Sequence, residues 1–237
     1  MKIEVLYPEI CCLYGDKGNM MYLRHYLPDA QFVETSLTSV PSFVGEDVAL
    51  IYMCSMSETN QELAIDLLLP HRDRLRTLMD SQTTVFLLTG NSFEVFGHYI
   101  EREDGSRIEG LGLLDSYAVR QVPRRFNSLV RGEFESMTIL GYTSRFSHSY
   151  SNDPASSFIR VNLGTGLNPT SDLEGIHVGQ VFATYLLGPL LVNNPDFTKH
   201  LLSCLGAPTP TLPFESDIYH AYATRLADYA KPGIDLS

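Results

Sequence analysis

The stretch TTVFLLTGNSFEVFGHYI (residues 83–100) decides the fold. Residues 85–88 form an apolar run that is long enough for a buried strand. The run ends in Thr-Gly-Asn, which tolerates a sharp turn, and Ser92 can then cap a helix that continues to Tyr99. A strand, a tight turn and a helix form the layout of a nucleophile elbow, which lifts one side chain to the top of a parallel sheet. Here the residue at the tip is Gly90.

Apolar runs alternate with helical patterns throughout the first half of the chain. Strands are predicted at residues 2–7, 31–34 and 47–53, and helices at residues 20–27, 60–69 and from 70 to about 79. Strands that alternate with helices and are apolar on both faces favour a parallel sheet between two layers of helices.

The second half of the chain has a different pattern. A hairpin turn at residues 104–106 is followed by runs with the alternation of antiparallel strands. The predicted strands are residues 117–122, 128–134, 137–142, 158–163 and 178–187, with a polar loop at 147–157.

The C-terminal region is predicted to be helical. Asn194 caps a helix that begins at Pro195 and ends near residue 205, a linker follows at 208–213, and a final helix covers about 215–230. Because no domain boundary is evident, a single domain over residues 1–237 is predicted.

Composition and charge narrow the classes of function. The chain is 44% hydrophobic and 19% charged, as is typical of globular proteins. Its 17 Lys and Arg residues face 28 Asp and Glu residues, so the formal net charge is −11. An acidic chain without a basic block is a poor candidate for binding nucleic acid or an anionic membrane. No apolar stretch is long enough for a transmembrane helix, so no membrane insertion is expected.

The cysteines and histidines show no metal-binding pattern. The four cysteines contain no CxxC pair, and the seven histidines contain no HxxxH or HxH pair. We therefore expect neither a metal nor a cofactor. The first residues have the pattern of a strand rather than of a signal peptide, which together with the cysteine pattern favours the reducing cytoplasm.

Four segments that span almost the whole chain carry a family resemblance. They are LYPEICCLYGDKGN (6–19), SMSETNQ (55–61), TGNSFEVFG (89–97) and EGIHVGQVFATYLLGPLLVNNP (174–195). The chain resembles the CobB/CobQ-like class I glutamine amidotransferases, most closely the GatD type. The last segment is similar to the family's EGxxxxNVxGTYLHGPLLxxNP. The resemblance implies a flavodoxin-like three-layer αβα sandwich, here with an antiparallel extension in the second half.

The resemblance also implies a chemistry and a partner. Active members use a Cys–His pair that forms a thioester with glutamine, and backbone N–H groups of a glycine-rich turn stabilise the oxyanion. GatD-type subunits work with a Mur-ligase-like protein, MurT, to amidate the peptidoglycan precursor lipid II. A MurT-type partner is therefore an expectation that rests on the resemblance alone.

Position by position, the catalytic groups of the family are absent from this chain. In the elbow motif the cysteine position falls on Gly90, and in the C-terminal motif the histidine position falls on Leu187. Residues 54–56 replace glycines of the oxyanion turn, and Glu58 replaces its aspartate. Loss of both nucleophile and base removes many orders of magnitude in rate. The motifs thus predict an inactive amidotransferase-like subunit with a structural or regulatory role.

An active amidotransferase or hydrolase with a relocated nucleophile is one alternative. Ser92 lies near the elbow, with His98 and His177 as the nearest bases in sequence, although its position also suits a helix N-cap. Cys54 lies at the end of a strand, where α/β sheets bind ligands, although a buried cysteine can simply fill space.

A binding module for an amino acid or another carboxylate is the other alternative. Arg124 and Arg125 lie near the position at which family members grip the glutamine α-carboxylate, and Arg125 fits the local pattern better. Glu58 and Asn91 are the further candidates for contact with such a ligand. In the opposing interpretation, Arg124 and Arg125 are solvent-exposed charges on a strand and bind no ligand.

Overall fold

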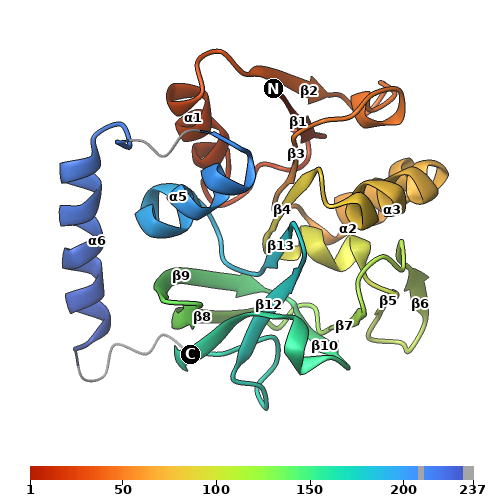
Figure 1. The fold of residues 1–237 in the computed structure, drawn as a ribbon. Helices are drawn as coiled ribbons and strands as arrows, with labels where there is room; N and C mark the ends of the chain where they lie inside the picture. The colour runs from red at the N-terminus through yellow and green to blue at the C-terminus, as the bar shows by residue number, and fades with distance from the viewer. Residues whose placement is uncertain (208–210, 232–237) are drawn as a thin grey trace.

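A long mixed sheet runs through the molecule (Figure 1). The structure is a computed structural model, and it describes residues 1–207 and 211–231. Within these residues the sheet has nine strands in the order β2-β1-β3-β4-β13-β12-β11-β8-β9. The predicted linker and the end of the predicted domain fall in part on residues 208–210 and 232–237, which lie outside the described residues.

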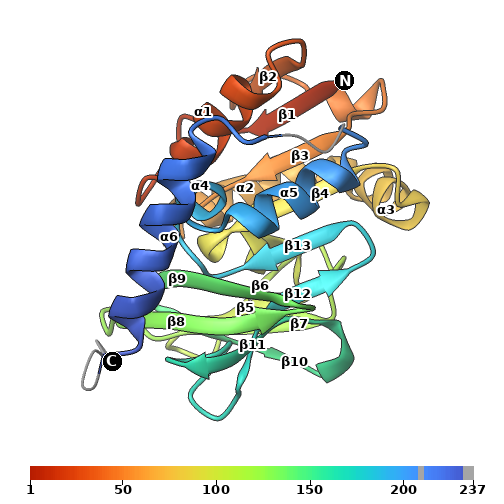
Figure 2. The same ribbon diagram turned by 60° about the vertical axis from the view of Figure 1, so that its left-hand side comes forward.

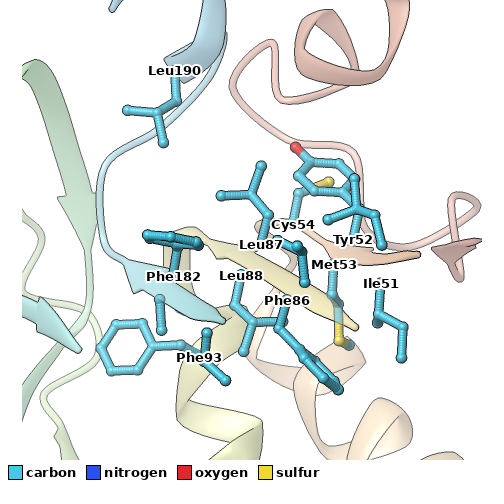
Figure 3. Packing of buried hydrophobic residues seen from close by; sticks show 14 of the residues in the cluster. Ile51, Tyr52, Met53, Cys54, Phe86, Leu87, Leu88, Phe93, Phe182 and Leu190 are labelled. Carbon is cyan, nitrogen blue, oxygen red and sulfur yellow. The ribbon is translucent and has the colours of Figure 1, made fainter. Parts of the chain in front are cut away.

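The first five strands in that order form the parallel half of the sheet. They are β2 (Gln31–Thr35), β1 (Lys2–Leu6), β3 (Leu50–Met53), β4 (Val85–Thr89) and β13 (Val181–Thr184). Every residue of β3, β4 and β13 is buried, as expected for parallel strands that are covered on both faces. Figure 3 shows the packing around β4, with Phe86 and Phe93 on one side and Leu190 on the other.

Helices cover both faces of the parallel half (Figures 1 and 2). One face carries α1 (Lys17–Tyr26), α4 (Leu190–Asn193) and α5 (Pro195–Cys204), and the other carries α2 (Glu58–Leu68) and α3 (Arg72–Ser81). The predicted three-layer αβα sandwich is therefore confirmed. None of the helices in the described part of the chain is both long and apolar enough to cross a membrane.

The last helix, α6 (Glu215–Tyr229), packs along the side of the molecule against α4, α5 and β9 (Figure 2). Two of its tyrosines hold it there through hydroxyl groups. Tyr222 donates to the carbonyl oxygen of Thr138 at 2.8 Å, and Tyr229 donates to that of Gly141 at 2.9 Å.

The antiparallel half extends the sheet and adds a smaller one. The extension consists of β12 (Leu173–Val178), β11 (Ser157–Leu163), β8 (Phe126–Phe134) and β9 (Met137–Arg145). The smaller sheet has the order β10-β7-β5-β6, with β10 (Ser147–Ser151), β7 (Ser116–Arg120), β5 (Tyr99–Glu101) and β6 (Arg107–Glu109). The pairing of β5 with β6 confirms the predicted hairpin. Short 3-10 turns complete the fold: η1 (Ser42–Val44), η2 (Leu69–His71) and η4 (Pro154–Ser156).

The predicted helix after the elbow is wrong. Residues after β4 form a 3-10 helix, η3 (Gly90–Phe96), and Tyr99 already belongs to β5. Ser92 is inside η3 and caps nothing. Its buried hydroxyl has two carbonyl oxygens within reach, those of Met53 (3.0 Å) and Thr89 (2.8 Å), and these bonds to β3 and β4 replace the predicted cap.

Two predictions for the second half of the chain, one of a strand and one of a loop, are also wrong. Residues 178–187 are not one strand, because Gly179 adopts φ 58° and turns the chain from β12 into β13. The predicted polar loop contains β10, in which Ser147 and Ser149 are buried because they bond to buried partners. Ser147 donates to the carboxylate of Glu94, and the Ser149 hydroxyl lies 2.5 Å from that of Tyr185.

Candidate functional site

The elbow tip lies at the carboxyl end of β4, where the backbone turns sharply. Gly90 has φ +63°, in the left-handed region that favours glycine. A Cβ atom at this position would overlap the Cβ atom of Ser55 and would stand 3.1 Å from its Cα atom. The elbow therefore keeps its bend, but the space above it is filled by the turn that follows β3.

Leu187 lies directly beside the elbow tip, beyond the end of the neighbouring strand β13. Its side chain is 5% exposed, and its backbone N–H donates to the carbonyl oxygen of Tyr142 at 2.9 Å. Its Cδ2 atom would be 3.3 Å from a Cβ atom at Gly90. Two positions from separate sequence motifs thus meet at one point, and the side chain at residue 187 is apolar.

A pocket of about 110 Å³ opens at this point. It brings together five of the seven candidate positions, namely Gly90, Leu187, Glu58, Asn91 and Arg125. It is smaller than the roughly 300–1,000 Å³ of common small-molecule sites. Ser55 and Met56 of the predicted oxyanion turn also line it, as do residues that the site prediction did not include, namely Leu13, Tyr14, Ser57, Ser144, Arg145, Phe146 and Tyr185. Of the described residues that line the pocket, none is a cysteine or a histidine.

The turn after β3 uses its backbone N–H groups internally. The N–H of Ser55 donates to Asp16 Oδ2 at 3.0 Å, and the Ser55 hydroxyl donates to the same oxygen at 2.5 Å. Asn91 holds the next residue: its Oδ1 accepts from the N–H of Met56 and its Nδ2 donates to the Met56 carbonyl, both at 3.0 Å. An oxyanion hole needs N–H donors that are free to meet the developing charge. These two donors already have partners.

Asp16, from the YGDKGN segment, is the buried anchor of this turn. Burial raises the pKa of its carboxyl group, and the hydrogen bonds from Ser55 oppose that shift. Gly188 packs against Asp16 so closely that a Cβ atom there would lie 2.6 Å from Asp16 Oδ1. Asp16 thus links the loop after β1, the oxyanion-turn position and the segment after β13.

Two arginines line the pocket in different ways. Arg125 is exposed at the rim, where its Nη1 donates to the Tyr14 hydroxyl and to Ser144 Oγ (3.0 Å). Arg145 is buried, and its guanidinium lies over the ring of Tyr185, 3.9 Å from the centroid. Residues near Arg145 in the sequence do not indicate its burial, because the side chain becomes buried only when β9 packs against η3.

Glu58 and Asn91 both line the pocket. Glu58 is half-buried in the first turn of α2, which begins at the N-cap Ser57. Asn91 follows the elbow tip, and both polar atoms of its side chain bond to Met56. Asn91 therefore stabilises the turn after β3, and its side-chain oxygen and nitrogen are already used in doing so.

The substitute nucleophiles lie outside the pocket. Ser92 is buried beneath the elbow and bonds to two backbone carbonyls. Cys54 donates to the carbonyl oxygen of Cys11 at 2.8 Å and lines a separate cavity between β1, β3 and α1. Burial raises the pKa of its thiol well above the ordinary value, which disfavours the reactive thiolate.

The histidines proposed as bases do not line the pocket either. His98 is exposed, and its Nε2 lies 3.0 Å from Asp115 Oδ1. His177 is half-buried on β12, with Nδ1 3.0 Å from the carbonyl oxygen of Val181. Among the described residues, no group of three or more His, Cys, Asp or Glu side chains could hold a metal ion.

Sequence comparison finds relatives that cover most of the chain. The GatD subunit of lipid II isoglutaminyl synthase from Staphylococcus aureus strain N315 is 27% identical over 211 residues, which cover 86% of this chain and 85% of the relative. The GatD subunit from Streptococcus pneumoniae is 24% identical over 207 residues, which cover 86% of this chain and 79% of the relative. The chain is a homologue of GatD. A comparison with models of known protein families found no match.

The fold comparison agrees with the resemblance to GatD. A crystal structure of a glutamine amidotransferase superposes with a TM-score of 0.55 at 14% identity, covering 86% of this chain and all of that one. A Thermotoga maritima glutamine amidotransferase gives a TM-score of 0.52 at 10% identity, covering 94% and 92% of the two chains. These likenesses confirm the amidotransferase type of fold.

Proposed function

We propose that this chain is a GatD-like glutamine amidotransferase domain without glutaminase activity, a structural or regulatory subunit in the amidation of lipid II. The observation that carries this proposal is the pocket at the elbow. Gly90 and Leu187 lie beside each other there, and the lining described above contains no thiol or imidazole.

The chemistry of amide hydrolysis explains why this observation matters. A cysteine hydrolase needs a nucleophile, a group that moves the proton, and free donors for the oxyanion. Glycine and leucine can neither attack a carbonyl carbon nor transfer a proton. The N–H groups of Ser55 and Met56 are already bonded to Asp16 and Asn91. The lack of a nucleophile and of a proton-transfer group, together with these two occupied donors, supports the proposed loss of activity.

The role as a subunit is supported by the relatives. Both are named as GatD subunits of lipid II isoglutaminyl synthase, so a second subunit is part of the proposal. We take this partner to be Mur-ligase-like, of the MurT type, as the sequence resemblance implies. In this proposal the chain, as one amidotransferase-like domain, keeps the fold and the docking surface and supplies no ammonia itself.

The release of ammonia from glutamine tests the loss of activity directly. We expect no ammonia above the protein-free background, either with the chain alone or with a co-expressed Mur-ligase-like partner. Variants Ser92→Ala and Cys54→Ala serve as controls for relocated chemistry. Turnover that either substitution abolishes would refute the proposal. Co-purification of the partner tests the subunit role separately, and a chain that never binds a Mur-ligase-like protein would contradict that part.

A second candidate function is binding of an amino acid or carboxylate without turnover. The observation in its favour is Arg125, whose guanidinium stands at the pocket rim and bonds only to hydroxyl groups among the described residues. Calorimetric titration with glutamine and glutamate measures this binding. The expected result is saturable heat that Arg125→Gln abolishes and Arg160→Gln, an exposed arginine of β11, leaves unchanged. No heat at millimolar ligand would exclude this candidate.

A further inference from the structure

A second pocket lies between the start of β8, the end of β9, the start of β10 and the connector at residues 165–169. Its volume is about 280 Å³, larger than that of the elbow pocket. It shares Arg125 and Arg145 with the elbow pocket and adds Arg124 and His148. We name it the arginine pocket after these four residues. It contains none of the motif positions Gly90, Leu187 or Glu58.

The arginine pocket is cationic in a protein that is strongly acidic overall. Three arginines line it, and no aspartate or glutamate does. Elsewhere, Arg102, Arg120 and Arg160 each face a carboxylate within 3.0 Å. Among the described residues, the three arginines of this pocket have no such ion pair. In a chain with net charge −11, three guanidinium groups around one cavity without a counter-ion indicate that the anion comes from outside.

Arg145 is the strongest sign of a missing ligand. Its side chain is 4% exposed, and its Nη2 donates to the carbonyl oxygen of Gly166 at 2.5 Å. Its Nε and Nη1 are buried without any hydrogen-bond partner in the described part of the chain. Burial lowers the pKa of Arg145, and nearby Tyr185, Glu174 and Glu94 oppose that shift, but neither glutamate lies within ion-pair distance of the guanidinium. Buried N–H groups of a guanidinium that lack an acceptor are costly, so they call for an acceptor in the pocket.

Two neutral side chains add unpartnered polar atoms to the same cavity. His148 Nδ1 and Asn127 Oδ1 are both buried without a partner in the described residues. Burial first, and then Arg145 and Arg124, lower the pKa of His148 to about 4, so its ring is neutral at pH 7. A neutral imidazole can donate from one nitrogen, and the amide of Asn127 can present its NH₂ group after a flip. Both can therefore serve an acceptor-rich ligand.

We propose that the arginine pocket binds the phosphate group of a phosphorylated ligand. Guanidinium groups match phosphate oxygens with two parallel hydrogen bonds each, and a phosphate offers more acceptors than a carboxylate. Its two negative charges also offset three guanidinium charges better than the single charge of a carboxylate. The volume leaves room for a phosphate and part of the group that it is attached to. This site is additional to the glutaminase-type pocket and does not depend on the loss of activity proposed there.

Titration with inorganic phosphate and inorganic pyrophosphate tests the site in the full chain. Calorimetry at low ionic strength and pH 7.5 should show saturable binding with one site per chain, and the ring resonances of His148 should shift in NMR spectra. Arg124→Gln should weaken binding about tenfold or more, because it removes a charge-assisted contact. Arg131→Gln, on β8 but outside the pocket, is the matched control and should leave the affinity unchanged.

The variants separate loss of binding from loss of folding. Arg145→Lys changes a buried group and can disturb the fold, whereas Arg124 is exposed, so its replacement should leave unfolding curves unchanged. Acetate and glutamate are titrated in parallel, and affinity equal to that for phosphate would overturn the assignment to phosphate. No saturable binding of either phosphate compound at about 10 mM, or binding that Arg124→Gln does not weaken, would overturn the site itself.

Discussion

Replacing Gly90 by alanine is the most direct test of how tightly Ser55 packs against the elbow tip. A Cβ atom at this position meets the Ser55 side chain, and the backbone is left-handed. The left-handed conformation costs about 1–2 kcal/mol for a non-glycine residue, and overpacking a tight site adds about 1–3 kcal/mol. Gly90→Ala should therefore lower the free energy of unfolding by about 2–5 kcal/mol.

The part of the Gly90→Ala cost that comes from overpacking depends on the Ser55 side chain, so it can be separated from the cost of the left-handed backbone. Ser55→Gly removes the overlapping Cβ atom, although it also removes the hydroxyl bonds to Asp16 and Leu13. In the double variant, Gly90→Ala should cost about 1–3 kcal/mol less than it does in the wild-type chain, since the overlap with the Ser55 Cβ atom is gone, although the left-handed backbone and the close Cα atom of residue 55 remain. Gly105→Ala is the matched control, because Gly105 has φ +80° with open space around its Cβ position.

Urea unfolding followed by circular dichroism measures all of these free energies. The m-values of all the chains that are compared must agree for the comparison to hold. Gly105→Ala should cost only about 1–2 kcal/mol and should add independently to Ser55→Gly. The reasoning fails if Gly90→Ala costs no more than Gly105→Ala, or if Gly90→Ala and Ser55→Gly are additive to within about 0.5 kcal/mol.

Three further predictions follow from the same contacts. The triple variant Ser55→Gly, Gly90→Cys and Leu187→His should gain a thiol that reacts with iodoacetamide at position 90, whereas Gly90→Cys alone should unfold more readily; no labelling of the triple variant would contradict the placement of these residues. Asn91→Ala should cost about 1–3 kcal/mol in urea unfolding, since it leaves two main-chain groups of the turn without partners; an unchanged midpoint would refute this. His148 has a pKa of about 4 in the folded chain, below its ordinary 6.5, so its protonation in acid favours the unfolded state. Between pH 7 and pH 4 this one group should lower the free energy of unfolding by at most about 3 kcal/mol. In His148→Gln, the free energy of unfolding should therefore fall by about that much less over the same pH range than in the wild-type chain.

Local pattern was sufficient for the framework of the fold. The apolar run at residues 85–88 is the core of β4, and the apolar strands around it form the predicted parallel sheet. The turn residues at 104–106 join β5 to β6 as expected. These features depend on side-chain period and on the φ preferences of a few neighbouring residues, which a single sequence contains.

Local pattern failed where the partners are distant in sequence. The hydroxyl of Ser92 matched an N-cap, but the ends of β3 and β4 offered it two carbonyl oxygens in the core. The polar composition of residues 147–157 suggested a loop. The residues near Ser147 and Ser149 in the sequence do not show that Glu94 and Tyr185 would bond to their hydroxyl groups. A buried polar side chain follows its hydrogen-bond partners, and these come from other elements.

From the sequence alone, the amidotransferase-type αβα fold could be predicted, and Gly90 and Leu187 could be proposed as the residues at the two motif positions. Only the tertiary structure decided that Gly90 and Leu187 meet beside Ser55, and that the N–H groups of the turn are already bonded. It alone placed Arg145 under the elbow with two nitrogens that have no hydrogen-bond partner among the described residues. The physical reason is that motif identity is a property of short segments, whereas overlap, burial and the absence of a partner belong to pairs of groups that only folding brings together.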